Sequence, residues 1–126
     1  MIMKIKSFLT AMLFLFASLA LAEQGIIEPT QNPDAPYRLF NTKNVYTLLK
    51  LDTSTGRIWQ VQWGQSSNRF TVPLNEKAIV TDGKPGRFTL HPTSNIYTFI
   101  LIDQITGVTW HVQWGDEEDR FIYRIK

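Results

Sequence analysis

The 126-residue sequence contains no cysteine and only two histidines. Without cysteine there is no disulfide framework, no thiol nucleophile and no thiol for lipid attachment, so the folded chain depends on its apolar core. His91 and His111 lie in no metal-ligand spacing, and the sequence has no GxSxG, no phosphate-binding glycine loop and no closely spaced carboxylate pair. We therefore expect a protein that is not an enzyme, with no cofactor and no metal.

Only one long apolar run is free of charge, and it lies at the start of the chain. Lys4 and Lys6 precede the run Ser7–Leu21, and Ala20-Leu21-Ala22 has the small-x-small pattern of a cleavage site. These features predict a signal peptide over residues 1–22 and a periplasmic or extracellular location. An uncleaved membrane anchor is the alternative, but the run is shorter than the roughly 20 residues that span a bilayer.

The chain without residues 1–22 has no excess of either charge. Lys4 and Lys6 account for two of the 13 basic residues, which leaves 11 against 11 acidic residues. Nothing in this balance attracts a phosphate backbone, so we expect no nucleic-acid partner. Residues 23–36 contain three prolines and no apolar periodicity, which predicts a flexible lead-in before the folded part.

An internal repeat is the main feature of the sequence. Residues 44–75 align without a gap on residues 95–126, with 13 identities in 32 positions. The similarity extends weakly upstream to Tyr37 and Phe88. The chain is therefore predicted to contain one domain, 37–126, made of repeat 37–75, linker 76–87 and repeat 88–126.

Each repeat has the pattern of four short strands, rich in β-branched and aromatic residues. The predicted strands are Tyr37–Phe40, Tyr46–Leu51, Arg57–Trp63 and Phe70–Leu74 in the first copy, and Phe88–His91, Tyr97–Ile102, Val108–Trp114 and Phe121–Ile125 in the second. The fold class is all-β, with two tandem four-stranded antiparallel meanders. We expect a pseudo-twofold axis and a sandwich or small barrel; propeller-like blades, closed into a ring by several chains, are the alternative.

The third strand of each copy alternates strictly. Trp59, Val61 and Trp63 share one face with period two, and Gln60 and Gln62 share the other. The expectation is that the tryptophan face forms the core and the glutamine face is solvated. A second interpretation places one tryptophan of each copy in an open groove, where its ring stacks on a ligand such as a sugar.

The candidate ligand-binding residues are repeated polar and aromatic positions: Trp63, Trp114, Gln62, Gln113, Arg69 and Arg120. The two arginines are kept while the loop before them changes from Gln65–Asn68 to the acidic Asp116–Asp119, so we expect them to belong to the repeat framework, paired with a turn aspartate or stacked on tryptophan. The acidic loop lacks the alternating ligands and the glycine of a calcium loop. Asp52 and Gly56, with Asp103 and Gly107, are typical of hairpin turns.

Two resemblances follow from these motifs. The pattern LDxxTGxxW at Leu51–Trp59, nearly repeated at Ile102–Trp110, resembles the blade motif of quinoprotein-type β-propellers; no cofactor-binding residue is carried over. The pattern PTxNxYxFxLLDxxTGxxWxVQW, at Pro92–Trp114 and more loosely at Thr42–Trp63, resembles paired repeats of small secreted bacterial proteins of unknown function.

The expected function is a secreted, non-catalytic binding or interaction module with an unknown protein or glycan as partner. Three alternatives remain: a lectin-like homo-oligomer that binds glycans, an inhibitor or immunity-type protein that acts on a partner enzyme through the acidic loop, and a hydrolase.

Overall fold

The structure, a computed structural model, describes residues 31–126. The predicted signal peptide and residues 23–30 of the predicted lead-in lie outside this range. The strands are β1 (Tyr37–Asn41), β2 (Thr47–Asp52), β3 (Ile58–Gln62), β4 (Phe70–Pro73), β5 (Phe88–Pro92), β6 (Thr98–Asp103), β7 (Thr109–Gln113) and β8 (Phe121–Arg124). One 3-10 turn follows the third strand of each copy, η1 (Ser66–Asn68) and η2 (Glu117–Asp119).

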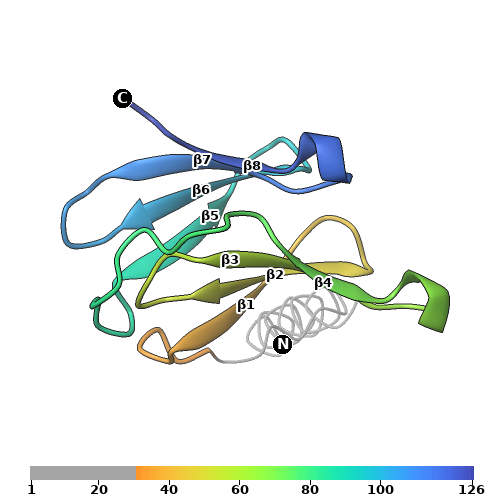
Figure 1. The fold of residues 1–126 in the computed structure, drawn as a ribbon, viewed down its shortest axis with the longest axis horizontal. Coiled ribbons are helices and arrows are strands. Elements are labelled where there is room, and N and C mark those ends of the chain that lie inside the picture. Colours follow the sequence, from red (N-terminus) through yellow and green to blue (C-terminus); the bar gives the residue numbers. More distant parts are fainter. Residues whose placement is uncertain (1–30) are drawn as a thin grey trace, which may run out of the picture. The chain divides into compact units, whose positions relative to one another are not determined.

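The strands form two antiparallel sheets, each a four-stranded meander. Strand order is β1-β2-β3-β4 in the first sheet and β5-β6-β7-β8 in the second, so each sheet is one sequence repeat (Figure 1). The predicted all-β class and the two tandem meanders are confirmed, in a two-sheet, sandwich-like form in which no barrel closes. Within residues 31–126 no helix is long and apolar enough to cross a membrane.

The central hairpin of each sheet turns as the sequence indicates. Gly56 and Gly107 have φ of 78° and 77°, in the left-handed region that favours glycine. The Asp52 carboxylate accepts a hydrogen bond from the Ser54 backbone N–H at 3.0 Å, and Asp103 accepts one from Ile105 at the same distance. The repeated Asp and Gly are therefore turn residues in both copies.

The two sheets bury opposite faces of equivalent strands. In the first sheet Leu49, Leu51 and Gln60 face the other sheet and are buried, with Leu49 paired directly to Gln60. In the second sheet the buried inner face carries Phe99 and Val112, which form a direct pair. Phe99 and Val112 are equivalent to Leu48 and Val61, which lie on the outer face of the first sheet. The sheets thus stack face to back.

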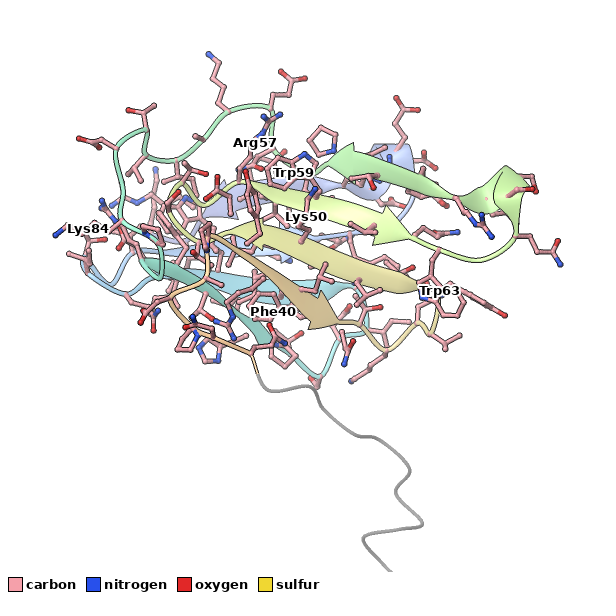
Figure 2. All side chains as sticks on the ribbon, turned by 90° about the horizontal axis from the view of Figure 1, so that it is seen from below. Phe40, Lys50, Arg57, Trp59, Trp63 and Lys84 are labelled. Atoms are coloured by element: carbon pink, nitrogen blue, oxygen red, sulfur yellow. The ribbon has the colours of Figure 1, made fainter. Side chains whose placement is uncertain are left out.

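This arrangement corrects the face assignment made from sequence. In the first copy the glutamine face is buried, since Gln60 is only 2% exposed, and the tryptophan face points outward. A pseudo-twofold axis would bury the same face in both copies, so it does not describe how these sheets meet. The physical reason lies in β2, where Lys50 pairs directly with Trp59 and its amine lies 4.7 Å from the ring centroid (Figure 2). A lysine favours the solvated face, and the tryptophan shares that face with it.

The core lies between the inner faces. Its buried members are Leu49, Leu51, Ile58, Leu74, Phe88, Leu90, Phe99, Leu101, Val112 and Trp114. Thr53, in the first hairpin turn, is fully buried beside this core. Its hydroxyl donates to the Ala35 carbonyl at 2.6 Å and accepts from the Gly86 N–H at 2.9 Å. Thr53 thereby fixes the residues before β1 and the end of the linker to the same turn.

Within residues 31–126, an ion pair at the start of the second sheet joins the buried Asp103 to the partly exposed Arg87. The Arg87 guanidinium donates to both oxygens of Asp103, with Nη2 to Oδ2 at 2.8 Å and Nε to Oδ1 at 3.1 Å. Hydrogen bonding to Arg87 holds the pKa of Asp103 well below its usual range. Since Asp103 is 3% exposed, the bidentate pair is also what makes its burial tolerable.

Replacement of Asp103 tests this pair. Asp103→Asn is expected to lower the free energy of unfolding by about 1–3 kcal/mol at neutral pH, measured by urea titration, because a hydrogen-bonded charge pair is lost. The folded-state pKa is lowered, so the carboxylate stabilises the protein fully above the unfolded pKa, roughly 4, and progressively less as the pH falls below it. The difference in free energy of unfolding between wild type and Asp103→Asn should therefore shrink as the pH falls below about 4.

Asp52→Asn is the matched control, because within residues 31–126 the Asp52 carboxylate bonds only Ser54 of its own turn. It should cost less than Asp103→Asn. Equal losses for the two variants, or a difference that is independent of pH, would contradict the role given to Arg87.

Candidate functional site

A pocket of about 390 Å³ is lined by residues of both sheets, at the ends of β3 and β7 and at the η2 turn. Its lining is Asn44, Thr47, Gln60, Gln62, Phe70, Tyr97, Gln113, Trp114, Gly115, Asp116, Glu117, Asp119 and Arg120. The first sheet contributes mainly amide and hydroxyl groups, and the second contributes the aromatic pair, the guanidinium and the carboxylates. Both repeats are therefore needed to build it.

Gln60 joins the two sheets on one side of this pocket. Its Oε1 accepts hydrogen bonds from the Gly115 N–H at 3.0 Å and from Arg120 Nε at 3.2 Å. Arg120 Nε also donates to the Gly115 carbonyl at 2.8 Å, and the guanidinium lies 5.5 Å from the Phe70 ring centroid. These contacts hold the η2 loop against the first sheet and satisfy a buried amide.

Tyr97 and Trp114 form the aromatic part of the lining. Their ring centroids lie 4.8 Å apart with planes inclined by 56°. Trp114 is 5% exposed, whereas Tyr97 is 44% exposed and can meet a ligand with its ring. Within residues 31–126, the buried indole Nε1 of Trp114 has no hydrogen-bond partner. It is a donor that a ligand or water oxygen in the pocket could satisfy.

The η2 loop gives the pocket an acidic rim. Asp116, Glu117 and Asp119 line the pocket, and all three are exposed. Oxygen atoms of Asp116, Glu118 and Asp119 can lie within 4.8 Å of one another. Exposed carboxylates of this kind accept hydrogen bonds from hydroxyl or ammonium groups.

A second, smaller pocket repeats half of this site on the outer face of the first sheet. It measures about 210 Å³ and is lined by Tyr46, Gln62, Trp63, Gly64, Gln65 and Asn68. Tyr46 and Trp63 repeat the aromatic pair at 5.2 Å, but Trp63 is 50% exposed and protrudes at the end of the sheet (Figure 2). Arg69 Nε donates to the Gly64 carbonyl at 2.7 Å, as Arg120 does to Gly115. We call this the half-pocket, because no sheet covers it within the described chain.

The structure divides the six candidate residues between these two places. Gln62, Gln113, Trp114 and Arg120 lie on the lining of the inter-sheet pocket. Trp63 lies in the half-pocket, with Arg69 bonded to its Gly64. Each arginine bonds the loop carbonyl five residues before it, rather than the turn aspartate considered above, and the loop contact fits a framework role.

Sequence reasoning missed Gln60 and Tyr97. Gln60 was expected on a solvated face, and Tyr97 was treated only as a repeated strand residue. A usable signal was present at Lys50, whose place opposite Trp59 in the hairpin indicates that the tryptophan face of the first copy is the wet one. That assignment turns Gln60 inward.

Comparison with known proteins adds no relative. No family model, curated protein or solved structure matches the chain. The resemblances drawn from the sequence motifs remain predictions.

Substitution of Gln60 tests how the site is built. Gln60→Ala should lower the free energy of unfolding by about 1–3 kcal/mol, because the Gly115 N–H and Arg120 Nε lose a shared acceptor. Gln62→Ala, on a half-buried neighbour, should change it by no more than about 0.5 kcal/mol. Urea titration of both variants measures the two changes in the free energy of unfolding. A Gln60→Ala variant as stable as wild type would contradict the burial of the glutamine face.

Proposed function

We propose that the protein binds a small polyhydroxylated ligand, a carbohydrate, in the inter-sheet pocket and releases it unchanged. The observation that carries this proposal is the composition of one lining. An accessible tyrosine ring, the amides of Gln60 and Gln62, and a rim of carboxylates converge there from both sheets.

The chemistry of a sugar suits these groups. One face of a pyranose ring presents C–H groups that pack on an aromatic ring, and Tyr97 offers that surface. The hydroxyls of the sugar both donate and accept hydrogen bonds, as the amide of Gln62 does. The carboxylates of Asp116 and Asp119 accept further hydroxyl protons. A purely apolar ligand would leave these polar groups without partners.

The ionisable groups near the pocket support binding rather than catalysis. The two histidines, His91 and His111, are not among its lining residues. Asp103, the carboxylate with a strongly lowered pKa, is engaged by Arg87. The rim carboxylates are exposed and lie on one loop, and the lining that the described residues form holds no buried carboxyl group to act as a general acid. The predicted export signal would bring the protein to a compartment where glycans are available.

A protein partner is the second candidate, and a single asymmetry favours it. The η2 loop carries four consecutive acidic residues, Asp116–Asp119, whereas the equivalent Gln65–Asn68 carries none. All eight residues are exposed. An inhibitor or immunity-type protein would use such a one-sided charged patch to steer a basic partner.

The carbohydrate proposal is tested by binding measurements on the purified chain. A glycan array identifies ligands, and calorimetric titration with the best saccharide gives the affinity. Tyr97→Ala should weaken binding at least about tenfold, because the stacking surface is lost. Tyr37→Ala removes a similarly exposed tyrosine at the far end of β1 and should leave the affinity unchanged. Absence of saccharide binding up to millimolar concentration would overturn the proposal.

Neutralisation of the acidic loop distinguishes the carbohydrate ligand from the protein partner. A variant with Asp116→Asn, Glu117→Gln, Glu118→Gln and Asp119→Asn should lose capture of a basic protein from an envelope extract if the partner is a protein. If the ligand is a sugar, the same variant should still stack the saccharide on Tyr97 and bind it with reduced affinity, measured by the same titration.

A further inference from the structure

Face-to-back stacking leaves one copy of each contact surface open. The outer face of the first sheet is equivalent, residue for residue, to the inner face of the second sheet. The outer face of the second sheet is likewise equivalent to the inner face of the first. The two open faces are therefore counterparts of two surfaces that already pack together inside the chain.

Both open faces carry large apolar side chains. On the outer face of the first sheet Tyr37, Leu39 and Trp63 are exposed; on the outer face of the second, Tyr123 is 66% exposed. Ile100, at the centre of the second face, is equivalent to Leu49, which is fully buried in the internal interface. Exposed apolar faces of this kind usually mark an interaction surface.

The open faces also carry the equivalents of a polar contact that joins the two sheets inside the chain. Inside the chain, Gln60 accepts from Gly115 and Arg120 across the interface. His111 is the equivalent of Gln60 and lies on the outer face of the second sheet. Its Nε2 is buried and has no hydrogen-bond partner within residues 31–126. On the outer face of the first sheet, Arg69 already holds the Gly64 carbonyl, in the geometry that Arg120 has with Gly115.

The half-pocket shows what a covering sheet would complete. Its aromatic pair, glycine and loop residues correspond to the contribution of the second sheet to the inter-sheet pocket. The missing contribution is that of the first sheet, whose equivalents on the outer face of the second sheet are Asn95, Thr98, His111, Gln113 and Phe121. The chain thus carries both halves of a second pocket on its two opposite outer faces.

We propose that copies of this chain assemble head to tail, with the second sheet of one copy covering the first sheet of the next. The His111 ring of one copy turns to present its nitrogen, which is buried in the single chain, and accepts from Gly64 and Arg69 of the neighbour. The half-pocket then becomes a complete second ligand pocket. The contact joins two different surfaces, so repetition closes a ring or extends a fibre. Rings of four to eight such sheets are known architectures, which corresponds to about two to four chains.

The proposed contact between copies differs from the internal interface mainly at Lys50. It takes the place of the buried Leu101, and its amine lies over the Trp59 ring. Burial of an amine is costly unless it is compensated, so Lys50 weakens the contact relative to the internal interface. Lys50→Leu should therefore raise the assembled fraction at a given concentration.

The experiment uses two variants, each with one face blocked, and light scattering on a sizing column. Trp63→Glu blocks the outer face of the first sheet, and Ile100→Glu blocks that of the second. The wild-type chain should elute with at least twice the monomer mass, and each variant as a monomer. An equimolar mixture of the variants should form a dimer, because it still contains one intact surface of each kind. Ile105→Glu, at a 70% exposed turn position, is the control and should assemble like wild type.

Circular dichroism and cooperative urea unfolding establish that the variants are folded. A monomeric wild type at millimolar concentration overturns the proposal, as does a mixture that stays monomeric. Assembly that survives in one of the two variants indicates a symmetric contact between identical faces and overturns it as well. None of these readouts involves a saccharide, so the assembly and the carbohydrate proposal fail independently.

Discussion

The packing of two sheets that are apolar on both faces is the constraint from which the rest of the structure follows. A meander with apolar side chains on a face gains stability when that face is removed from water. Here the first sheet buries Leu49 and Gln60, and the second buries the face with Phe99 and Val112. Because these faces are not equivalent, the pocket between them is lined by different groups on its two sides, and the complementary pair of faces remains outside.

The repeated loop after the third strand gives both copies the same framework. In each, an arginine Nε bonds the carbonyl of the glycine that follows the tryptophan. The framework fixes the loop, and the loop side chains then differ: neutral at Gln65–Asn68, acidic at Asp116–Asp119. Only the acidic loop borders the complete pocket. Duplication thus supplies the scaffold, and divergence of one loop supplies the chemistry on which the proposed ligand recognition depends.

Local features of the fold could be predicted from the sequence, and the packing between sheets could not. The predicted bounds of all eight strands lie within one residue of the observed bounds, because alternation and turn residues are local signals. The sequence predicts the wrong buried face in the first copy, because Trp59 and Trp63 favour a core whereas Lys50, on the same face, favours solvent. The pairing of Arg87 with Asp103, and of Gln60 with Arg120, depends on residues 16 and 60 positions apart. No short motif predicts such contacts, so only part of the site was found.

Face-to-back stacking places Val112 in the interface between the sheets and its equivalent, Val61, on the outer face of the first sheet, so these two residues test the stacking most directly. The chain has no cysteine, so Val61→Cys and Val112→Cys each introduce a single thiol whose reaction with a maleimide can be followed by mass spectrometry. At a dilution at which the chain is monomeric, the thiol at position 61 should react readily. The thiol at position 112, where the valine is fully buried, should react only at the rate of unfolding. Equal protection at both positions would contradict face-to-back stacking.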